Sequence, residues 1–488
     1  MITFSCLLAF VVISNWLYSK KVEKIFGVNA NNQTPAIRIN DRVDYIPMNK
    51  WKAFMIEFLD IAGLGPIFGV ILGAVYGPIA LIWIVLGGLI GGAMHDYISG
   101  MMSVREDGKS IAEVIGKWLG TSAKQIMRIF TLLLMILVGA SFMMGPAKIL
   151  ANMTGIIQIG SLVIEQQNLV FLWVAIILVY YFLATLLPID KIIGRVYPIL
   201  GLAMLFMAVG VMVALYIHSN QVPELNFSQI FQNKHPQALT HPIFPLVFIT
   251  IACGAISGFH STQSPLMART IKNEKDGRLV FWWAMTSETI VALIWATAAM
   301  SFFSGIDGLN SYLAQQNNNP APFVTLLTKQ WLGSLGSFLA ILGVVAAPIT
   351  TGDTALRSAR LIISDFLNFK QNKIQNRIIV TIPIFIIAFG LTFLKFDALW
   401  RLMFWFNQVL ATIVLWTISV YLFRNKKAYI ISLIPAIFMT AVVISYVIIA
   451  KEAIGWQSNY AYFISFLLTI ITIIIFYNFT KSKKNEYS

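Results

Sequence analysis

The chain has 488 residues, of which 58% are hydrophobic and only 11% are charged, and its mean hydropathy is +0.76. A soluble domain carries about 25% charged residues, so this composition excludes an ordinary soluble protein and indicates an integral membrane protein. The formal net charge of +14 is therefore interpreted through the positive-inside rule and not as a nucleic-acid signal. Cys6 and Cys253 both lie in apolar stretches, which predicts no disulfide framework.

Apolar stretches of about 20 residues, the length that crosses a bilayer, recur along the whole chain. We expect about thirteen spanning helices, over residues 2–19, 53–77, 79–104, 126–147, 169–187, 197–217, 243–266, 279–304, 333–356, 378–394, 399–423, 428–450 and 460–479. The longest expected connections are 20–52, 218–242 and 305–331, and no soluble domain fits in them. The N-terminus lacks the basic region of a secretory signal, which favours an uncleaved first helix.

The basic residues are distributed unequally between alternate connections. Of the 35 Lys and Arg residues, all but six fall in one alternate set, which includes residues 20–52 and the C-terminal tail. The six on the opposite side are Lys148, Lys234, Lys329, Lys395, Arg401 and Lys451. The positive-inside rule therefore predicts a multi-pass protein of the inner (plasma) membrane, with its N-terminus outside and its C-terminus in the cytoplasm.

Two expected spans are interrupted. The first break is Ile61–Gly69 (IAGLGPIFG), and the second, about 195 residues later, is Cys253–Pro265 (CGAISGFHSTQSP). Glycine lowers the cost of leaving helical geometry and proline lacks an amide donor. With the expected topology, each break falls in the first of five spans, and the two groups of five have opposite orientation. Such an inverted repeat with paired broken helices is typical of secondary transporters, whose substrate binds at the breaks.

The fold class expected from this pattern is an all-α polytopic membrane protein with a five-plus-five inverted repeat. Its parts are residues 1–52, an N-terminal helix and cytoplasmic loop; 53–217, the first repeat; 243–423, the second repeat; and 424–488, two accessory helices and a cytoplasmic tail.

Ionisable residues inside spans are costly, so each is a functional candidate. They are Glu57, Asp60, His95, Asp96, His260, Glu288 and Asp353. At the first break, unwound carbonyls can ligate a cation and the N-terminus of the next half-helix can face an anion. The alternative is a packing cluster of glycines with a proline kink.

His260 is the most polar point of the second break, beside Ser257, Ser261, Thr262 and Gln263. An imidazole can hold a substrate carboxylate or relay a proton near neutral pH. The alternative is a histidine that only hydrogen-bonds to backbone freed by the break.

The ninth span ends in Thr350, Thr351 and Asp353, whose oxygens suit a small cation or an exchangeable proton. The alternatives are hydroxyls bonded within the membrane helices and an Asp353 paired with Arg357 or Arg360.

Adjacent helical residues point about 100° apart, so His95 and Asp96 are not expected to share a partner. Asp96 is expected to pair with a cytoplasmic basic residue or to gate an inner vestibule. Glu288 is a separate candidate proton carrier, and Asn407 with Gln408 marks a further polar point. No P-loop, no metal-ligand spacing and no nucleophile elbow occur, which argues against an ATP-driven pump or an intramembrane enzyme.

The sequence resembles the carbon starvation protein family, known as CstA. The resembling stretches are 60–69 (DIAGLGPIFG), His95-Asp96 with 103–110 (SVREDGKS), 253–260 (CGAISGFH), 350–360 (TTGDTALRSAR) and 399–415 (LWRLMFWFNQVLATIVL). The resemblance implies the five-plus-five fold of the amino acid–polyamine–organocation superfamily. It also implies peptide utilisation during carbon limitation or proton-coupled pyruvate transport, and this chain is expected to be a short-form member.

The resemblance implies a site at Gly63, Gly65, Pro66, Ser257, Gly258, Phe259, His260, Thr350, Thr351 and Asp353. The chain departs from the family pattern at His95, where long members tend to have Gln, and after His260. The substrate is therefore not carried over from either branch.

These observations predict a transporter, without cofactor, that imports a short peptide or pyruvate-like carboxylate as part of the carbon starvation response. The expected substrate-binding residues are Gly63, Gly65, Pro66, Ser257, Gly258, Phe259 and His260. The expected coupling residues are Asp60, Ala62, Thr350, Thr351 and Asp353, with Na⁺ or H⁺ as the coupling ion and Thr350 and Thr351 as the candidate Na⁺ ligands. The expected partners are the small-molecule substrate and the bilayer, with no nucleic acid; the alternatives are a channel or a starvation-linked membrane sensor.

Overall fold

The computed structural model describes the chain except for residues 42–44, 156, 160–161, 187–192, 219–223, 225, 227, 304, 368, 370–372 and 483–488. In the described part, helices account for nearly all regular structure. In the first half they are α1 (Ile2–Phe26), α2 (Pro35–Arg38), α3 (Lys50–Ala62), η1 (Gly65–Gly69), α4 (Val70–Ala74), α5 (Ile79–Leu86), η2 (Gly87–Gly92), α6 (Ala93–Arg105), α7 (Ile111–Leu119), α8 (Thr121–Thr154), α9 (Gln166–Leu186) and α10 (Ile193–Ile217).

In the second half they are α11 (Ile243–Thr250), α12 (His260–Ala268), η4 (Glu274–Asp276), η5 (Arg278–Trp283), α13 (Ala284–Phe302), α14 (Ile306–Gln315), α15 (Ala321–Ala340), η6 (Ile341–Ala346), α16 (Ala347–Phe366), α17 (Ile374–Leu391), α18 (Phe396–Arg424), α19 (Ile430–Ile449) and α20 (Ser458–Ser482). One short antiparallel hairpin, β1 (Ile157–Ile159) with β2 (Leu162–Ile164), lies between α8 and α9, which the all-α expectation did not include.

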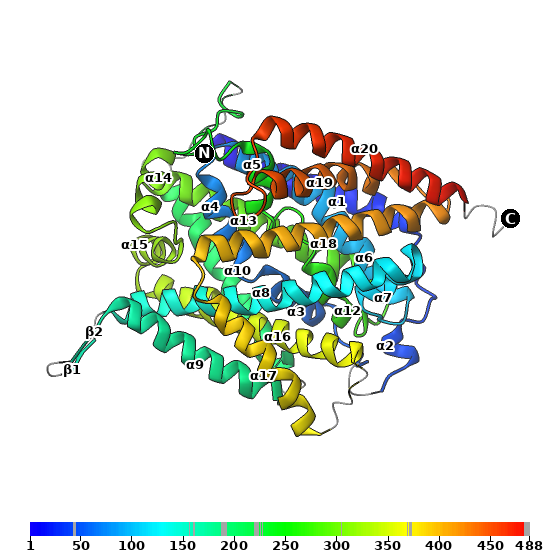
Figure 1. The fold of residues 1–488 in the computed structure, drawn as a ribbon, viewed down its shortest axis with the longest axis horizontal. Helices are drawn as coiled ribbons and strands as arrows, with labels where there is room; N and C mark the ends of the chain where they lie inside the picture. The colour runs from blue at the N-terminus through cyan, green and yellow to red at the C-terminus, as the bar shows by residue number, and fades with distance from the viewer. Residues whose placement is uncertain are drawn as a thin grey trace.

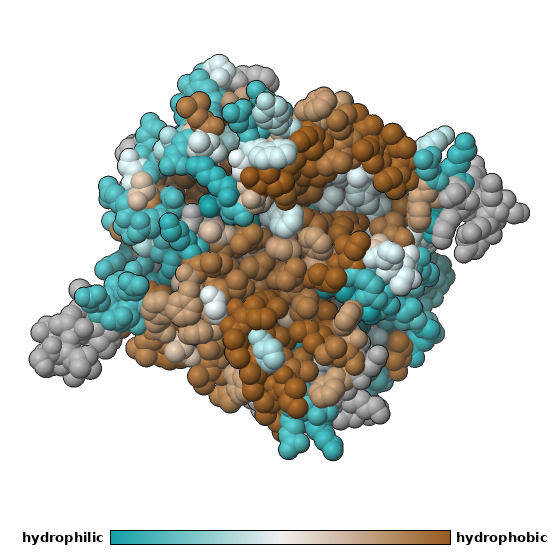
Figure 2. Space-filling model, in the orientation of Figure 1, coloured by the Kyte–Doolittle hydropathy of each residue, from teal (hydrophilic) through white to brown (hydrophobic). Residues whose placement is uncertain are grey.

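The long helices run broadly along the long axis of the molecule, and the two termini lie toward opposite ends (Figure 1). Hydrophilic residues gather at these two ends, and a band of hydrophobic residues covers the surface between them (Figure 2). Large apolar side chains on several long helices are exposed, including Phe206 at 59%, Ile386 at 65% and Phe466 at 64%. An apolar surface of this extent is unfavourable in water and is expected for a protein surrounded by lipid.

Within the described residues, eleven helices are long and apolar enough to cross a membrane, or twelve if the bent pair α3 and η1–α4 is one span. The predicted seventh span over 243–266 is two short helices, α11 and α12, and is not among them. The chain is thus a multi-pass helical membrane protein, whereas the count of thirteen spans stays a prediction.

The first break lies where the sequence predicted it. α3 begins at an Asn49 cap whose side chain accepts a hydrogen bond from the Trp51 amide, and it ends at Ala62. After Gly63 and Leu64, the chain continues as a π-helical turn with Pro66 near its start, and the second half-helix is inclined by 51° to the first. Proline fits at that position because a helix start leaves its amide without an intrahelical acceptor.

The second break is longer. α11 ends at Thr250, residues 251–259 are not helical, and α12 begins at His260. Gly254 has a φ of +82°, a conformation that side chains other than glycine rarely adopt.

The structure corrects the predicted connection over 305–331. That stretch contains α14 and the first half of α15, which continues into α16 with a kink at Gly333. Polar residues such as Asn310 and Asn317 interrupt the hydrophobic pattern there, so the helices were not evident from hydropathy.

Candidate functional site

The two breaks contact each other in the buried interior. A Cβ built at Gly65 in the first break would lie 2.2 Å from the Cys253 Sγ in the second. One at Gly73 in α4 would lie 2.2 Å from the Ile251 side chain. Glycine at these positions lets the second half of the first broken helix approach the non-helical segment. The two unwound segments therefore form one site, although nearly 190 residues separate them in the chain.

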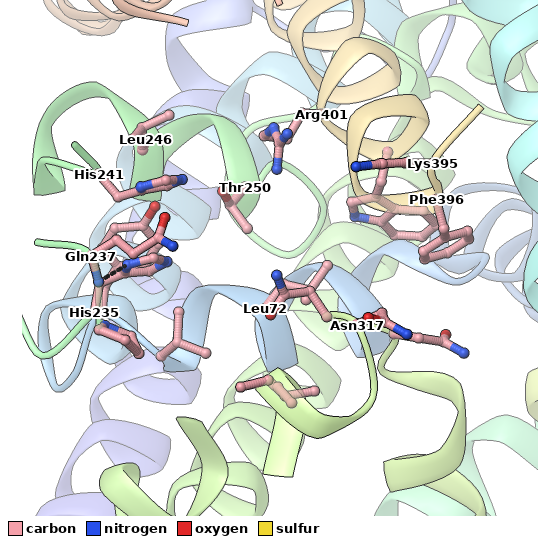
Figure 3. Close-up of a pocket in the computed structure, with 18 of the residues that line it drawn as sticks. Leu72, His235, Gln237, His241, Leu246, Thr250, Asn317, Lys395, Phe396 and Arg401 are labelled. Carbon is pink, nitrogen blue, oxygen red and sulfur yellow. Dashed lines mark hydrogen bonds between the residues drawn. The ribbon is translucent and has the colours of Figure 1, made fainter. Parts of the chain in front are cut away.

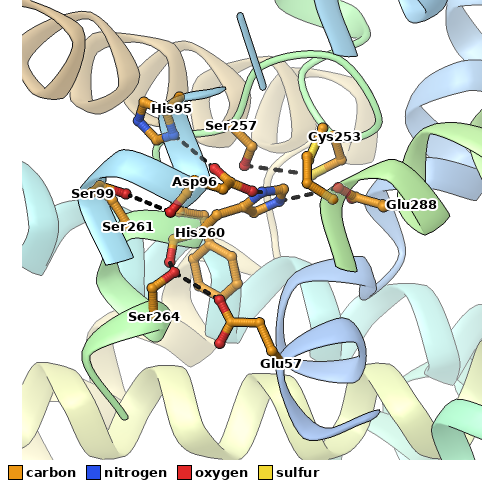
Figure 4. Close-up of polar contacts among 12 residues, drawn as sticks. Glu57, His95, Asp96, Ser99, Cys253, Ser257, His260, Ser261, Ser264 and Glu288 are labelled. Carbon is orange, nitrogen blue, oxygen red and sulfur yellow. Dashed lines mark hydrogen bonds and ion pairs between the residues drawn. The ribbon is translucent and has the colours of Figure 1, made fainter. Parts of the chain in front are cut away.

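A carboxylate from α6 joins two histidines beside this contact (Figure 4). Asp96 Oδ2 lies 2.6 Å from the Nδ1 atom of His260, at the start of α12. The other oxygen, Oδ1, lies 2.7 Å from the Nδ1 atom of His95. All three side chains are buried, with at most 1% of their surface exposed. The expectation that Asp96 pairs with a cytoplasmic basic residue was wrong, because its carboxylate turns inward to His260. His95 and Asp96 contact each other, which the expectation that they do not share a partner did not address.

Two further carboxylates extend this cluster. Glu288 from α13 approaches the free side of the His260 ring, with Oε2 3.4 Å from Nε2. Glu57 from α3 lies on the Ser264 side of the cluster, where its Oε1 accepts a hydrogen bond of 2.7 Å from the Ser264 hydroxyl in α12. Ser264 Oγ also lies 3.0 Å from the His260 carbonyl oxygen, so Glu57 is joined to the same turn of α12. We call Glu57, His95, Asp96, His260 and Glu288 the buried cluster.

The buried cluster has spare hydrogen-bonding capacity. Among the described residues, no hydrogen-bond partner is found for Glu57 Oε2, His95 Nε2, His260 Nε2 or either carboxylate oxygen of Glu288. Asp60 Oδ1, one turn after Glu57, likewise has no hydrogen-bond partner among the described residues. Burying ionised groups costs several kcal/mol each unless they are paired and hydrogen-bonded, so this arrangement is unfavourable for stability and makes the buried cluster a functional candidate. These atoms can exchange protons among themselves or accept a ligand.

α18 packs against the second break and forms hydrogen bonds with it. Asn407 Oδ1 accepts a hydrogen bond of 2.6 Å from the Phe259 amide, and its Nδ2 donates one of 3.1 Å to the Ser257 hydroxyl. Gly258 packs so closely on α18 that an added Cβ would lie 2.3 Å from the Ala411 amide nitrogen. A second helix, α5, also contributes, because Trp83 Nε1 donates a hydrogen bond of 2.8 Å to the Ile251 carbonyl. Backbone groups that the break releases are thereby paired inside the protein, as membrane depth requires.

The structure brings the predicted substrate-binding residues together. Gly63, Gly65 and Pro66 lie in the first break and are buried. Ser257, Gly258, Phe259 and His260 lie in the second break or directly after it, and are also buried. Their role as a substrate site stays a prediction.

The predicted coupling residues are divided between two places. Asp60 and Ala62 lie in the last turn of α3, beside the first break. Thr350, Thr351 and Asp353 lie in α16, where both threonine hydroxyls donate hydrogen bonds to the Ala347 carbonyl, at 2.6 and 3.3 Å. Asp353 Oδ1 lies 3.9 Å from Arg357, the pairing that the sequence left open. Both alternatives raised for α16 are thus present, and its cation role stays a prediction.

One group has the composition of a metal site. Ligand atoms of Cys253, His260 and Glu288 all lie within 4.8 Å of one another and are buried. Thiolate, imidazole and carboxylate are ligands that borderline divalent cations accept.

Sequence reasoning identified each member of the buried cluster but treated them as separate candidates, and it missed Ser264 as the link to Glu57. The signal that could have joined them is the scarcity of ionisable groups: apolar spans that hold so few tend to pair them with one another.

Comparison with known proteins places this geometry in context. The family model described as "Carbon starvation protein CstA" matches residues 1–166 and 150–330. An "Uncharacterized membrane protein" of Haemophilus influenzae is 41% identical over 342 residues, which are 62% of this chain and 92% of that protein. The "Peptide transporter CstA" of Bacillus subtilis is 31% identical over 324 residues, 56% of this chain and 54% of the relative. The "Pyruvate/proton symporter BtsT" of Escherichia coli is 27% identical over 337 residues, 58% and 46% of the two chains.

The matched region thus spans about half the length of these two named transporters. Among solved structures, a mutant of the Eremococcus coleocola manganese transporter matches 92% of this chain and 99% of its own, with a TM-score of 0.56 and 14% identity. A complex of the same transporter with an aromatic bis-isothiourea compound matches 95% and 99%, with a TM-score of 0.54 and 15% identity. At this identity the likeness concerns the fold alone.

Proposed function

The chain belongs to the carbon starvation protein CstA family, and we propose that it is a secondary transporter of the inner membrane. It imports a small nutrient, either a short peptide or a pyruvate-like carboxylate, as the names of two relatives suggest. The observation that carries the proposal is the contact of two broken helices at a buried, ionisable cluster. Discontinuous helices at the midplane are where secondary transporters bind substrate and coupling ions.

The architecture in this proposal has thirteen spans, with α3–α4 and α11–α12 each counted as one broken span. Residues 53–217 and 243–423 form the two inverted repeats, and each begins with a broken helix. Support comes from the position of the breaks and from the fold likeness to a transporter over most of the chain. The orientation in the proposal, with the N-terminus outside, rests on the distribution of basic residues.

Substrate binds between the breaks in this account. The atoms of the buried cluster without a hydrogen-bond partner, such as His260 Nε2, offer polar groups beside the breaks, and the glycines at 65 and 258 let the break segments pack closely around them. A carboxylate of the substrate would be held by His260 when that ring is protonated or by the N-terminal end of η1–α4 or α12.

The coupling ion is a proton carried by the buried cluster. Asp96 orients His260 through Nδ1, which leaves Nε2 directed toward Glu288. Binding of one proton by the His260–Glu288 pair raises the charge beside the second break by one unit, and transfer of a proton between the two side chains needs no large movement of a heavy atom. Sodium coupling at Thr350 and Thr351, with carbonyls around Ala62, is the alternative within the same proposal.

Reconstitution of the purified protein in liposomes tests the proposal. Radiolabelled pyruvate and dialanine are supplied separately, with a proton gradient or a sodium gradient imposed. Accumulation of one of them under the proton gradient, abolished by a protonophore, is expected. His260→Gln should lose this accumulation, whereas His218→Gln, which changes an exposed histidine stacked on Trp331, should keep it. Absence of uptake of both substrates under every gradient would contradict the proposal.

A further inference from the structure

A cavity of about 860 Å³ opens at the end of the molecule opposite the predicted cytoplasmic face. Its walls come from the loop before α11, the loop after α14, the start of α18 and the segment after α19. Figure 3 shows His235, Gln237 and His241 on one side and Lys395 and Phe396 on the other, with Thr250 and Arg401 between them. The cavity is separate from the buried cluster, none of whose members lines it.

The cavity gathers most of the positive charge of its face. The positive-inside rule depletes this face of Lys and Arg, yet four of its few basic residues line the cavity: Lys148, Lys395, Arg401 and Lys451. Among the described lining residues, the only acidic one is Glu452, which accepts a hydrogen bond of 2.8 Å from Arg401 Nε and one of 2.7 Å from Tyr446. Among the lining residues that the structure describes, four basic side chains stand against one acidic one, so this lining has an excess of positive charge and is electropositive.

Both histidines of the cavity experience this field. Burial, together with the neighbouring His241 and the charge of Arg401, lowers the pKa of His235 to about 4. Burial also lowers the pKa of His241, as do the charges of Arg401 and Lys451. The two rings, stacked with centroids 4.4 Å apart, are therefore neutral at pH 7 and add polar groups without further charge.

The inner end of the cavity reaches the broken helices. Leu72 of α4 and Thr250, the last residue of α11, both line it, and the second break begins at the next residue. The aromatic rings of Phe396 and Trp400 line it as well, and Trp400 packs on Phe68 of the first break with centroids 5.6 Å apart. These rings form an aromatic layer between one wall of the electropositive cavity and the first break.

We propose that this cavity is an outer anion-binding vestibule, which captures a carboxylate-bearing substrate before it passes the aromatic layer to the two breaks. Its role in import rests on the proposed function, but anion capture itself does not. A cleft lined by one sign of charge concentrates the opposite ion and raises its rate of encounter by 10- to 10³-fold. The vestibule therefore favours a substrate with net negative charge, such as pyruvate, over a zwitterionic dipeptide.

Thiol labelling tests anion capture without requiring transport. Gln237→Cys is introduced in a Cys6→Ser background, because Cys6 is exposed whereas Cys253 is buried. A negatively charged thiosulfonate reagent should label position 237 about ten times faster than a positively charged one, after each rate is normalised to a free thiol. Pyruvate should slow this labelling saturably, and an uncharged amide of similar size should not.

Matched variants assign the effect to the cavity. Lys395→Gln with Lys451→Gln should weaken protection by pyruvate at least fivefold, and Glu452→Gln should strengthen it. Lys329 is an exposed residue of the same predicted face that does not line the cavity, so Lys329→Gln should leave protection by pyruvate unchanged. Equal labelling by both reagents together with no protection by pyruvate would overturn the proposal. Protection without uptake in liposomes would keep the vestibule and refute the transport function.

Discussion

Asp96 of α6 and His260 of α12, which are 164 residues apart in the chain, are joined by a buried contact of 2.6 Å between Oδ2 and Nδ1. The same carboxylate reaches His95 with its other oxygen. Asp96 therefore fixes the ring of His260 and directs Nε2 toward Glu288. This contact connects the second break to α6, which belongs to the span after the first broken helix.

Asp96→Asn should uncouple the transporter. The amide keeps the shape of the carboxylate but removes its charge, so His260 loses its charged hydrogen-bond partner. We expect accumulation driven by a proton gradient to be lost, whereas exchange of labelled for unlabelled substrate without a gradient continues. Equal loss of accumulation and exchange would indicate that the contact is only structural.

Gly65→Ala should destabilise the contact between the breaks. The new methyl group would overlap Cys253, and overpacking of this kind costs about 1–3 kcal/mol. The unfolding midpoint in detergent should fall and uptake should be lost. Cys253→Gly in the same protein should restore part of both, because it removes the overlapping side chain. Gly390→Ala, where nothing lies within 4 Å of the new Cβ, should be neutral. A stable, active Gly65→Ala protein would contradict the packing described here.

Asn407→Ala should distort the second break. Its side chain is hydrogen-bonded to the Phe259 amide and the Ser257 hydroxyl, and leaving such buried groups unpaired costs about 1–3 kcal/mol. We expect a lower unfolding midpoint and a raised KM for uptake. The matched control is Thr412→Ala on the same helix, since that hydroxyl donates a hydrogen bond to the Gln408 carbonyl of its own helix. Similar effects of both substitutions would exclude a specific role for Asn407.

The pH dependence of stability should report on the vestibule. The folded pKa of His235 is about 4, below its ordinary value of 6.5, so the unfolded chain binds more protons between these two values. Stability from this group is complete above pH 6.5 and is lost as the pH falls toward 4. His235→Gln should therefore flatten the fall in unfolding midpoint over that range. An unchanged profile would show that the ring is not held neutral.

The sequence predicted the breaks because glycine, proline and polar residues within apolar spans have a direct backbone consequence. Gly65 and His260 both lie where that reasoning placed them. The partners of Asp96 and Glu57 could not be derived, because the sequence gives no rotation of α3, α6 and α12 about their axes. The helices over 305–331 were missed for a different reason: polar residues of this stretch line the vestibule and interrupt the hydrophobic pattern.

The most direct test of the central claim, that the buried cluster carries the coupled proton, is the internal pH of proteoliposomes as substrate is added. A trapped pH-sensitive dye would record this with pyruvate or dialanine and no imposed gradient. The account predicts that one substrate acidifies the lumen with the unmodified protein and with His218→Gln, and that neither does so with Asp96→Asn or His260→Gln. Substrate entry without acidification, or acidification that survives both cluster variants, would contradict it.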